Sequence, residues 1–330
     1  MGQRSTVRYR GKEYPVLKTN RIRDRTYFLI ERIARTPRER YKALCPAAPP
    51  DERKCGVLLF PRDQASMQHI KVLRRLSQQT PSNLPRIISY AERRDDVAIA
   101  VNWVEGVSLD AYSLNADEGV LTRRSPTNIM RCFTGLALGL RQLHKRAGVI
   151  HGDLKPGNLV LTGKSQRLVM IDFGSAWMRM KTMHRQPSDG ETEAYAAPEQ
   201  LFDGPCIYEA IDQFSASVVA YELMTGQLPY GGMGGRAGLP DKIEIYEKQW
   251  KPPSMLSPHR NDVPKRIWNR IDAILKRALS LNPEGRYPTD DAWLEDLHAL
   301  RSEIDRRATT VPENDWMLKG ARLLSRIMGR

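Results

Sequence analysis

The sequence predicts an α+β fold of two lobes, a small β-rich N-terminal lobe and a larger helical C-terminal lobe. Short apolar runs typical of strands gather before residue 106, and amphipathic stretches typical of helices dominate after residue 128. Between them, two further apolar runs at 149–161 and 168–176 carry polar residues at their ends. The 330 residues are enough for one large or two small domains with a buried core.

The N-terminal lobe is predicted to contain strands with one helix between them. Apolar segments bounded by turn signals predict strands at 26–33, 40–46, 54–60 and 96–106. The Pro-rich segment 46–53 predicts a turn. Residues 64–79 predict a helix, because apolar side chains recur there at helical spacing: Met67, Ile70, Leu73 and Leu76.

The C-terminal lobe is predicted to be helical. Helices are expected at 128–148, 212–226, 264–281 and 289–304. The first ends at Gly148, a good helix terminator, and the second is apolar nearly all round, as a buried central helix should be. We divide the chain into a basic extension, an N-terminal lobe, a C-terminal lobe and a basic amphipathic tail: 1–21, 22–104, 105–302 and 303–330.

Composition indicates a soluble globular protein with an excess of positive charge. Hydrophobic residues make up 41% and charged residues 27%, and no apolar run approaches the roughly 18 residues that a spanning helix needs. The N-terminus lacks the apolar core of a secretion signal. Four scattered cysteines without CxxC spacing indicate neither a disulfide framework nor a zinc site. We therefore expect a reduced, cytoplasmic protein.

The net charge of +14 is concentrated at the ends of the chain. Residues 1–42 contain 13 Lys and Arg against 4 Asp and Glu, a difference of +9. Residues 316–330 place basic side chains opposite an apolar helix face. An anionic partner or a membrane surface could bind these termini, whereas no specific nucleic-acid motif accompanies the charge.

The segment "VIHGDLKPGNLVL" (149–161) is the strongest chemical signal. It holds Asp153, Lys155 and Asn158 on one loop between apolar runs, and "LVMIDFGSA" (168–176) follows with Asp172 before Phe173 and Gly174. Two apolar strands that present carboxylate, amide and ammonium groups from their ends predict a metal–phosphate site.

Further motifs complete a resemblance to the eukaryotic-like Ser/Thr protein kinases, in the form common among bacteria. After the two segments above come "AYAAPE" (194–199) and "NPEGRY" (282–287), in the order of that family. The resemblance covers about residues 22–302. It implies a bilobal protein-kinase-like fold and transfer of the ATP γ-phosphate to a protein hydroxyl, with ATP and Mg²⁺ as cofactors.

The resemblance also implies roles for single residues. Asp153 matches the catalytic Asp that accepts the hydroxyl proton, and Lys155 would neutralise charge on the transferring phosphate. Asn158 and Asp172 would hold Mg²⁺. The hinge "VNWVEG" implies Val101 as gatekeeper, with backbone groups of Asn102 and Val104 facing adenine.

Four other positions are implied to shape or support the site. Thr192 matches the Thr that contacts the catalytic Asp in Ser/Thr kinases, although Glu191 stands where the family has Gly. Glu199 and Arg286 match a buried structural ion pair, and Asp212 matches the residue that holds the catalytic-loop backbone.

The phosphate-binding part of the N-terminal lobe departs from the family. No glycine occurs between Gly11 and Gly56, so "ARTPRER" (34–40) stands in place of a Gly-rich turn. Phe60 lies near the position of the third-strand Lys, and the partner Glu would fall near His69 in a stretch, 64–91, without Asp or Glu. We expect another cation to serve, with Arg62 first and the alternatives Lys54, Arg35, Arg38 and Arg40.

Two further features of the sequence concern glycines, at position 152 and in the run 231–238. Gly152 stands where many regulated kinases carry an Arg that binds an activating phosphate, so activation through that pocket is not expected, although Ser175, Thr182 and Ser188 are available. The run "GGMGGRAG" (231–238) is predicted to be a loop of the helical lobe, away from nucleotide.

Three functions remain open at this point. The first is an ATP- and Mg²⁺-dependent Ser/Thr kinase with an altered phosphate clamp, and the second is a pseudokinase that acts as a scaffold or switch. The third is a small-molecule phosphotransferase, since "HGDLxxxN" also resembles the aminoglycoside kinases. The long segment from Asp172 to Glu199 disfavours the third. Retention of Asp153, Lys155, Asn158 and Asp172 favours catalysis over the second.

Overall fold

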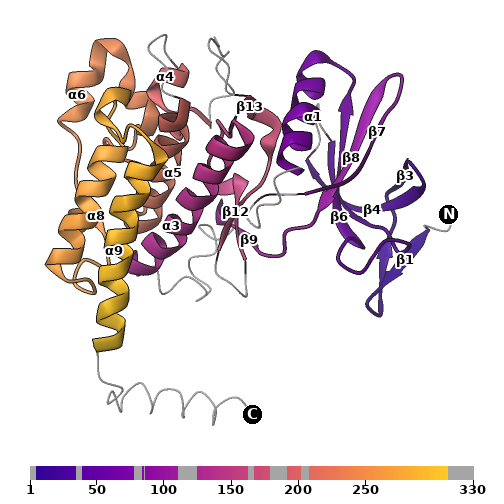
Figure 1. Cartoon of the computed structure of the whole chain (residues 1–330), viewed down its shortest axis with the longest axis horizontal. Helices are drawn as coiled ribbons and strands as arrows, with labels where there is room; N and C mark the ends of the chain where they lie inside the picture. Colours follow the sequence, from indigo (N-terminus) through magenta and orange to yellow (C-terminus); the bar gives the residue numbers. More distant parts are fainter. Residues whose placement is uncertain are drawn as a thin grey trace.

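A β-rich N-terminal lobe and a helical C-terminal lobe make up the computed structural model, as the sequence predicts (Figure 1). The structure describes residues 5–34, 39–77, 84, 86–110, 125–162, 167–178, 192–201 and 208–310. None of the helices in these ranges is long and apolar enough to cross a membrane.

A six-stranded antiparallel sheet forms the N-terminal lobe, with its strands in the spatial order β3-β4-β5-β6-β8-β7. Its strands are β3 (Lys18–Ile22), β4 (Arg25–Ala34), β5 (Glu39–Leu44), β6 (Lys54–Pro61), β7 (Ile87–Glu92) and β8 (Asp96–Asn102). Along β6, Cys55, Val57 and Leu59 pack into a core on one face. The residues between them therefore face the other side of the sheet, toward the C-terminal lobe.

The sheet begins earlier in the chain than residue 22. The segment expected as a basic extension forms a hairpin, β1 (Thr6–Tyr9) and β2 (Lys12–Pro15), followed by β3. The guanidinium of Arg93 donates to Asn20 Oδ1 at 2.7 Å and to the Arg21 carbonyl at 2.6 Å, and Arg23 Nε donates to the Tyr90 carbonyl at 3.2 Å. These bonds join β3 to the β7–β8 turn, so the sheet curls toward closure.

Helix α1 (Gln64–Ser77) lies between the sheet and the C-terminal lobe (Figure 1). Ile70, Leu73 and Leu76 are buried, as their helical spacing predicts. The helix packs against β7 on one side, and against the segment after Asp172 on the other. It is therefore placed to link the two lobes.

In its described residues, the C-terminal lobe is built on four long helices, α3 (Pro126–Gln142), α5 (Tyr208–Thr225), α8 (Lys265–Ala278) and α9 (Asp290–Thr310). Helix α5 is buried almost all round, and α3 packs against both α5 and α9. A π-helical turn, η2 (Leu143–Ala147), extends α3 to Gly148, whose φ of 64° ends the helix in the left-handed conformation. The shorter helices of this lobe are α4 (Pro198–Leu201), α6 (Ile243–Glu247) and α7 (Pro253–Leu256).

Short strands at the boundary between the lobes carry the polar loops. Strand β10 (Val149–Ile150) pairs with β13 (Trp177–Met178), and β11 (Leu159–Leu161) pairs with both β12 (Leu168–Met170) and β9 (Val107–Ser108). Turns of 3₁₀ helix follow at η3 (Pro156–Asn158), η4 (Phe173–Ser175), η5 (Thr192–Ala194), η6 (Gly234–Gly238), η7 (Pro240–Lys242) and η8 (Pro283–Gly285). The pairing of β11 with β12 brings the loop 151–158 beside Asp172.

Candidate active site

Asp212 of α5 binds the backbone of the loop between β10 and β11. The two carboxylate oxygens of Asp212 accept hydrogen bonds from the backbone N–H groups of His151 and Gly152, each at 2.8 Å. A buried carboxylate that binds two consecutive amides fixes the backbone just before Asp153. Asp212 thus links α5 to the loop that carries Asp153.

His144 in turn supports Asp212. Its Nε2 lies 2.8 Å from Asp212 Oδ2 and its Nδ1 lies 2.7 Å from Asp290 Oδ2, and all three side chains are fully buried. Burial lowers the pKa of His144, but the hydrogen bonds to Asp212 and Asp290 outweigh it and raise the pKa to about 10. Burial likewise raises the pKa of Asp212, and the bond and charge of His144 bring it below its ordinary value. A buried imidazolium therefore joins η2, α5 and α9.

Asp153 has two oxygens in different surroundings. Its Oδ2 accepts a hydrogen bond from Asn158 Nδ2 at 3.0 Å and lies 3.2 Å from Lys155 Nζ. Asn158 Nδ2 also donates to the Asp153 carbonyl at 2.8 Å, which closes the loop on itself. The Oδ1 atom is buried and has no hydrogen-bond partner in the described part of the chain. One oxygen is therefore fixed within the loop, whereas the other has no such bond.

The position of Asp172 is set by the packing of its neighbour, Phe173. Phe173 is buried and its ring lies 4.8 Å from the His151 ring. Asp172 adopts a φ of 62°, a left-handed conformation that costs a non-glycine residue about 1 kcal/mol. Its Oδ1 accepts from the Gly174 amide at 3.1 Å, and its Oδ2 pairs with the guanidinium of Arg40. Burial raises the pKa of Asp172, but the charge and hydrogen bond of Arg40 hold it below the ordinary value.

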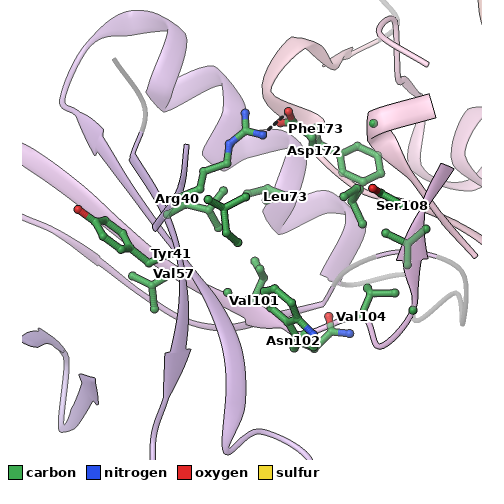
Figure 2. Close-up of a pocket in the computed structure, with 18 of the residues that line it drawn as sticks. Arg40, Tyr41, Val57, Leu73, Val101, Asn102, Val104, Ser108, Asp172 and Phe173 are labelled. Atoms are coloured by element: carbon green, nitrogen blue, oxygen red, sulfur yellow. Dashed lines mark hydrogen bonds and ion pairs between the residues drawn. The ribbon is translucent and has the colours of Figure 1, made fainter. Parts of the chain in front are cut away.

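A cavity of about 450 Å³ lies between the sheet and the loops that carry Asp172 (Figure 2). Its walls come from β4, β5, β6, α1, the segment 101–106 and the strands β9 and β11. Gly157 lines it beside Asn158, and the Ile171 amide donates to the Asn158 carbonyl at 2.9 Å. Asp153 and Lys155 do not line the cavity themselves. Asp153 is bonded to Asn158, which is the neighbour of the lining residue Gly157.

The hinge residues line the opposite wall. Val101, Asn102 and Val104 all border the cavity. The Asn102 side chain accepts from the Arg86 amide, and the Asn102 amide donates to the Arg86 carbonyl at 2.9 Å, so its side chain is already engaged. In the described residues the Val104 amide has no hydrogen-bond partner, which leaves it available to a ligand base.

The expected clamp cation is not Arg62 in this arrangement. Arg62 is exposed and does not line the cavity, and Lys54 pairs with Glu105 over the ring of Trp103. Phe60 is buried against His69, with ring centroids 5.0 Å apart. Among the described lining residues, Arg40 is the only Lys or Arg.

The supporting residues come together around this centre. Arg286 makes two bonds to Glu199, at 2.6 and 2.8 Å, and the two side chains are 0% and 3% exposed. The pair joins α4 to the turn after α8. Thr192 begins η5, but its side chain lies outside the described atoms. Arg35, Arg38, Thr182, Ser188, the cysteine at 206 and the tail 311–330 lie outside the described residues.

The glycine-rich run has a packing role that sequence reasoning missed. A Cβ on Gly234 or Gly235 would collide with the backbone of Ala194 or Ala196, and a Cβ on Gly238 would collide with Pro198. The run lets η6 contact the segment before α4 backbone to backbone. The sequence contained a signal for this contact, because clustered glycines indicate close approach of two backbones.

Gly152 is required by its surroundings as well. Its φ is 68°, and a Cβ there would overlap the ring of Trp177. Trp177 therefore fills the space that a side chain at position 152 would need. Strain and collision together explain why this loop carries glycine.

The available donors fit a metal–nucleotide complex better than a metal alone. No group of three or more His, Cys, Asp or Glu side chains in the described ranges could hold a metal ion. Asp172 and Asn158 offer two oxygen ligands, the number that Mg²⁺ takes from proteins when phosphates supply others.

Comparison with known families gives one match. The model of the family described as "Protein kinase domain" matches residues 60–296, which is more than half of the chain. That range contains the loop 151–158, Asp172 and the ion pair of α4.

Curated relatives from bacteria are similar to the chain. It is 31% identical over 211 residues to the Ser/Thr-protein kinase Pkn1 of Myxococcus xanthus, covering 62% of this chain and 28% of the relative. It is 31% identical over 183 residues to the tyrosine-protein kinase MasK of Myxococcus xanthus, covering 53% and 26%. For the Ser/Thr-protein kinase PkaA of Streptomyces coelicolor the identity is 29% over 215 residues, covering 64% and 36%. The chain thus spans about a quarter to a third of the length of these relatives.

A solved structure shares the fold. The crystal structure of the Mycobacterium tuberculosis PknI kinase domain matches with a TM-score of 0.56 at 19% identity, covering 83% of this chain and 95% of that chain. At this identity the likeness concerns the fold alone.

Proposed function

This chain belongs to the protein kinase domain family, and on that premise we propose that it transfers the γ-phosphate of ATP to a Ser or Thr hydroxyl of a protein. The observation that carries the proposal is the state of Asp153. Its Oδ2 is fixed by Asn158 and Lys155, while its buried Oδ1 has no partner in the described residues. A buried acceptor without a partner is costly, and an incoming hydroxyl would satisfy it.

The residues divide the chemistry between them. Asp153 Oδ1 accepts the hydrogen bond of the acceptor hydroxyl and orients it, and takes its proton as the new O–P bond forms and the bond between the γ-phosphorus and the departing ADP breaks. The ammonium of Lys155, next to Asp153, offsets negative charge on the transferred group. Asn158 and Asp172 would hold Mg²⁺, which when bound would neutralise phosphate charge. The apolar cavity wall and the free Val104 amide suit a purine base.

Several finer points belong to the same proposal. The relatives Pkn1 and PkaA are named as Ser/Thr kinases and MasK as a tyrosine kinase, so the Ser/Thr preference rests on two of these three names. We place the chain in the cytoplasm, where ATP is supplied and the buried thiols of Cys45 and Cys55 remain reduced. The basic residues near the N-terminus would serve an anionic partner or a membrane surface.

Transfer of labelled phosphate tests the proposal. Purified chain is incubated with Mg²⁺ and γ-labelled ATP, with a mixture of acceptor proteins, beside an Asp172→Ala variant. We expect label on Ser or Thr of an acceptor or of the chain itself, and loss of labelling in the variant. Absence of transfer by the wild type to every acceptor would instead favour a pseudokinase, and label on Tyr would revise the acceptor class.

A further inference from the structure

We propose that Arg40 is the side chain that binds the nucleotide phosphates, in place of a cation on β6. This inference rests on the proposed function and names a residue of the same site. It follows from strand register, from the unused donors of the guanidinium, and from the exclusion of the other described cations.

The register of β5 and β6 places Arg40 beside the position where a third-strand cation would face the cavity. Arg40 on β5 is the direct cross-strand partner of Leu58 on β6. Both residues line the cavity, and Phe60, the next residue of β6 on that face, is buried against His69. Neighbouring strands lie only about 4.8 Å apart, a distance that the longer side chain of Arg easily covers. The positive charge is therefore displaced by one strand, and lies opposite Leu58, the cavity-facing residue of β6 next to Phe60 on that face.

The guanidinium of Arg40 has donors to spare. One Nη pairs with Asp172 Oδ2, as Figure 2 shows. The Nε–H is buried and has no hydrogen-bond partner among the described residues. A planar guanidinium with donors left over suits two oxygens of a phosphate chain.

The ion pair with Asp172 also defines what must change when nucleotide binds. Arg40 competes with a metal ion for Asp172 Oδ2. Phosphate oxygens would offer the guanidinium of Arg40 new acceptors, and Asp172 would help to hold Mg²⁺, which when bound would neutralise phosphate charge. The side chains of Arg40 and Asp172 are 30% and 15% exposed. Because they form an ion pair, neither charge is left unpaired in the partly desolvated cavity before binding.

The other described cations near the site are committed or distant. Lys54 forms an ion pair with Glu105, and Lys155 forms one with Asp153. Arg62 is exposed and lies outside the cavity. Lys42, the other cation of β5, pairs with Glu31 at 3.0 Å.

Equilibrium binding measurements separate this role from catalysis. Calorimetry gives the affinities of wild type, Arg40→Ala and the control Arg62→Ala for Mg²⁺-ATP, Mg²⁺-ADP and adenosine. We expect Arg40→Ala to weaken ATP and ADP binding about tenfold or more, the order of one charge-assisted contact, and to leave adenosine binding unchanged. Arg62→Ala should match wild type for all three ligands. Retained adenosine binding shows that Arg40→Ala is folded.

A rescue variant tests the register argument. Leu58→Lys in the Arg40→Ala background returns the charge to β6, and we expect it to recover most of the lost ATP affinity. If Arg40→Ala binds ATP as wild type does, or binds it more tightly because Arg40 merely blocks Asp172, the inference is wrong. If Leu58→Lys restores nothing while adenosine still binds, the placement by register is wrong. Wild type that binds adenosine but neither ATP nor ADP would overturn the inference, and wild type that binds none of the three would overturn the proposed function itself.

Discussion

Asp153 and Asp172 show how two carboxylates on adjacent loops are prepared for different tasks. Asp153 is held by an amide and an ammonium and keeps one buried oxygen without a partner in the described chain. Asp172 is aimed by a buried Phe173 and neutralised by Arg40. In the proposed function, one group accepts a proton and the other helps to hold a cation. Residue identity alone does not distinguish them, because the difference lies in their partners.

At this scale we predict that ATP binding depends strongly on Mg²⁺. Without the metal, the phosphates bring further negative charge to the carboxylate of Asp172, whereas with it Asn158 and Asp172 supply oxygen ligands. The ATP affinity of the wild type should fall at least about tenfold when Mg²⁺ is removed by a chelator. Calorimetry checks this, with adenosine as the control ligand that should not respond. Equal ATP affinities with and without the metal would contradict this account of Asp172.

Secondary-structure elements are tied together by buried charge as well as by apolar packing. His144 in η2 bridges Asp212 of α5 and Asp290 of α9, and Asp212 holds the loop before Asp153. A change in this cluster therefore reaches both the stability of the helical lobe and the position of the catalytic loop.

The raised pKa of His144 predicts a pH dependence of stability. The folded pKa of about 10 lies above the ordinary value of 6.5, so the contribution is full below pH 6.5 and is lost as pH rises toward 10. The free energy of unfolding should fall by up to about 1.4 kcal/mol per pH unit between about pH 6.5 and about pH 7.5, a window that ends roughly one unit below the ordinary Cys pKa of about 8.5. Urea denaturation at several pH values measures this slope. The matched variant His144→Gln should be less stable and should show a flatter slope, and identical slopes would count against a buried imidazolium.

The elements that could be predicted from sequence are those with a strong apolar period. The strands at β4, β5, β6 and β8 and the four long helices follow from such patterns. The hairpin β1–β2 and strand β3 were missed because charged and exposed residues dominate "TVRY", "KEYP" and "KTNRI". Strand β7 was missed because its residues are only half buried.

The site was partly predictable for a related reason. Asp153, Lys155, Asn158 and Asp172 are close in sequence on two loops that neighbouring strands join, so their proximity could be predicted. The proposed phosphate-binding cation could not be predicted, because the preference for Arg62 rested on its distance along β6. Arg40 reaches the cavity through the pairing of β5 with β6, and register across strands is not visible in a single strand's sequence.

At the scale of the whole molecule, the two lobes contribute different parts of the proposed site. The N-terminal lobe supplies the cavity walls, Arg40 and the hinge, while the C-terminal lobe supplies Asp153, Lys155 and Asn158. Strand β3 and its bonds to the β7–β8 turn curl the sheet, so residues 18–22 are part of the framework of the N-terminal lobe. Binding and chemistry are therefore separable by mutation.

The most direct measurement of the central claim takes both quantities from one preparation. Wild type and Asp153→Asn are compared for Mg²⁺-ATP affinity by calorimetry and for transfer of γ-labelled phosphate to protein. We predict equal affinities within about twofold, and a rate of transfer at least about 100-fold lower in the variant, because the amide cannot accept the hydroxyl proton. An Asp153→Asn variant that transfers phosphate at the wild-type rate would show that Asp153 is not the base and would contradict the account.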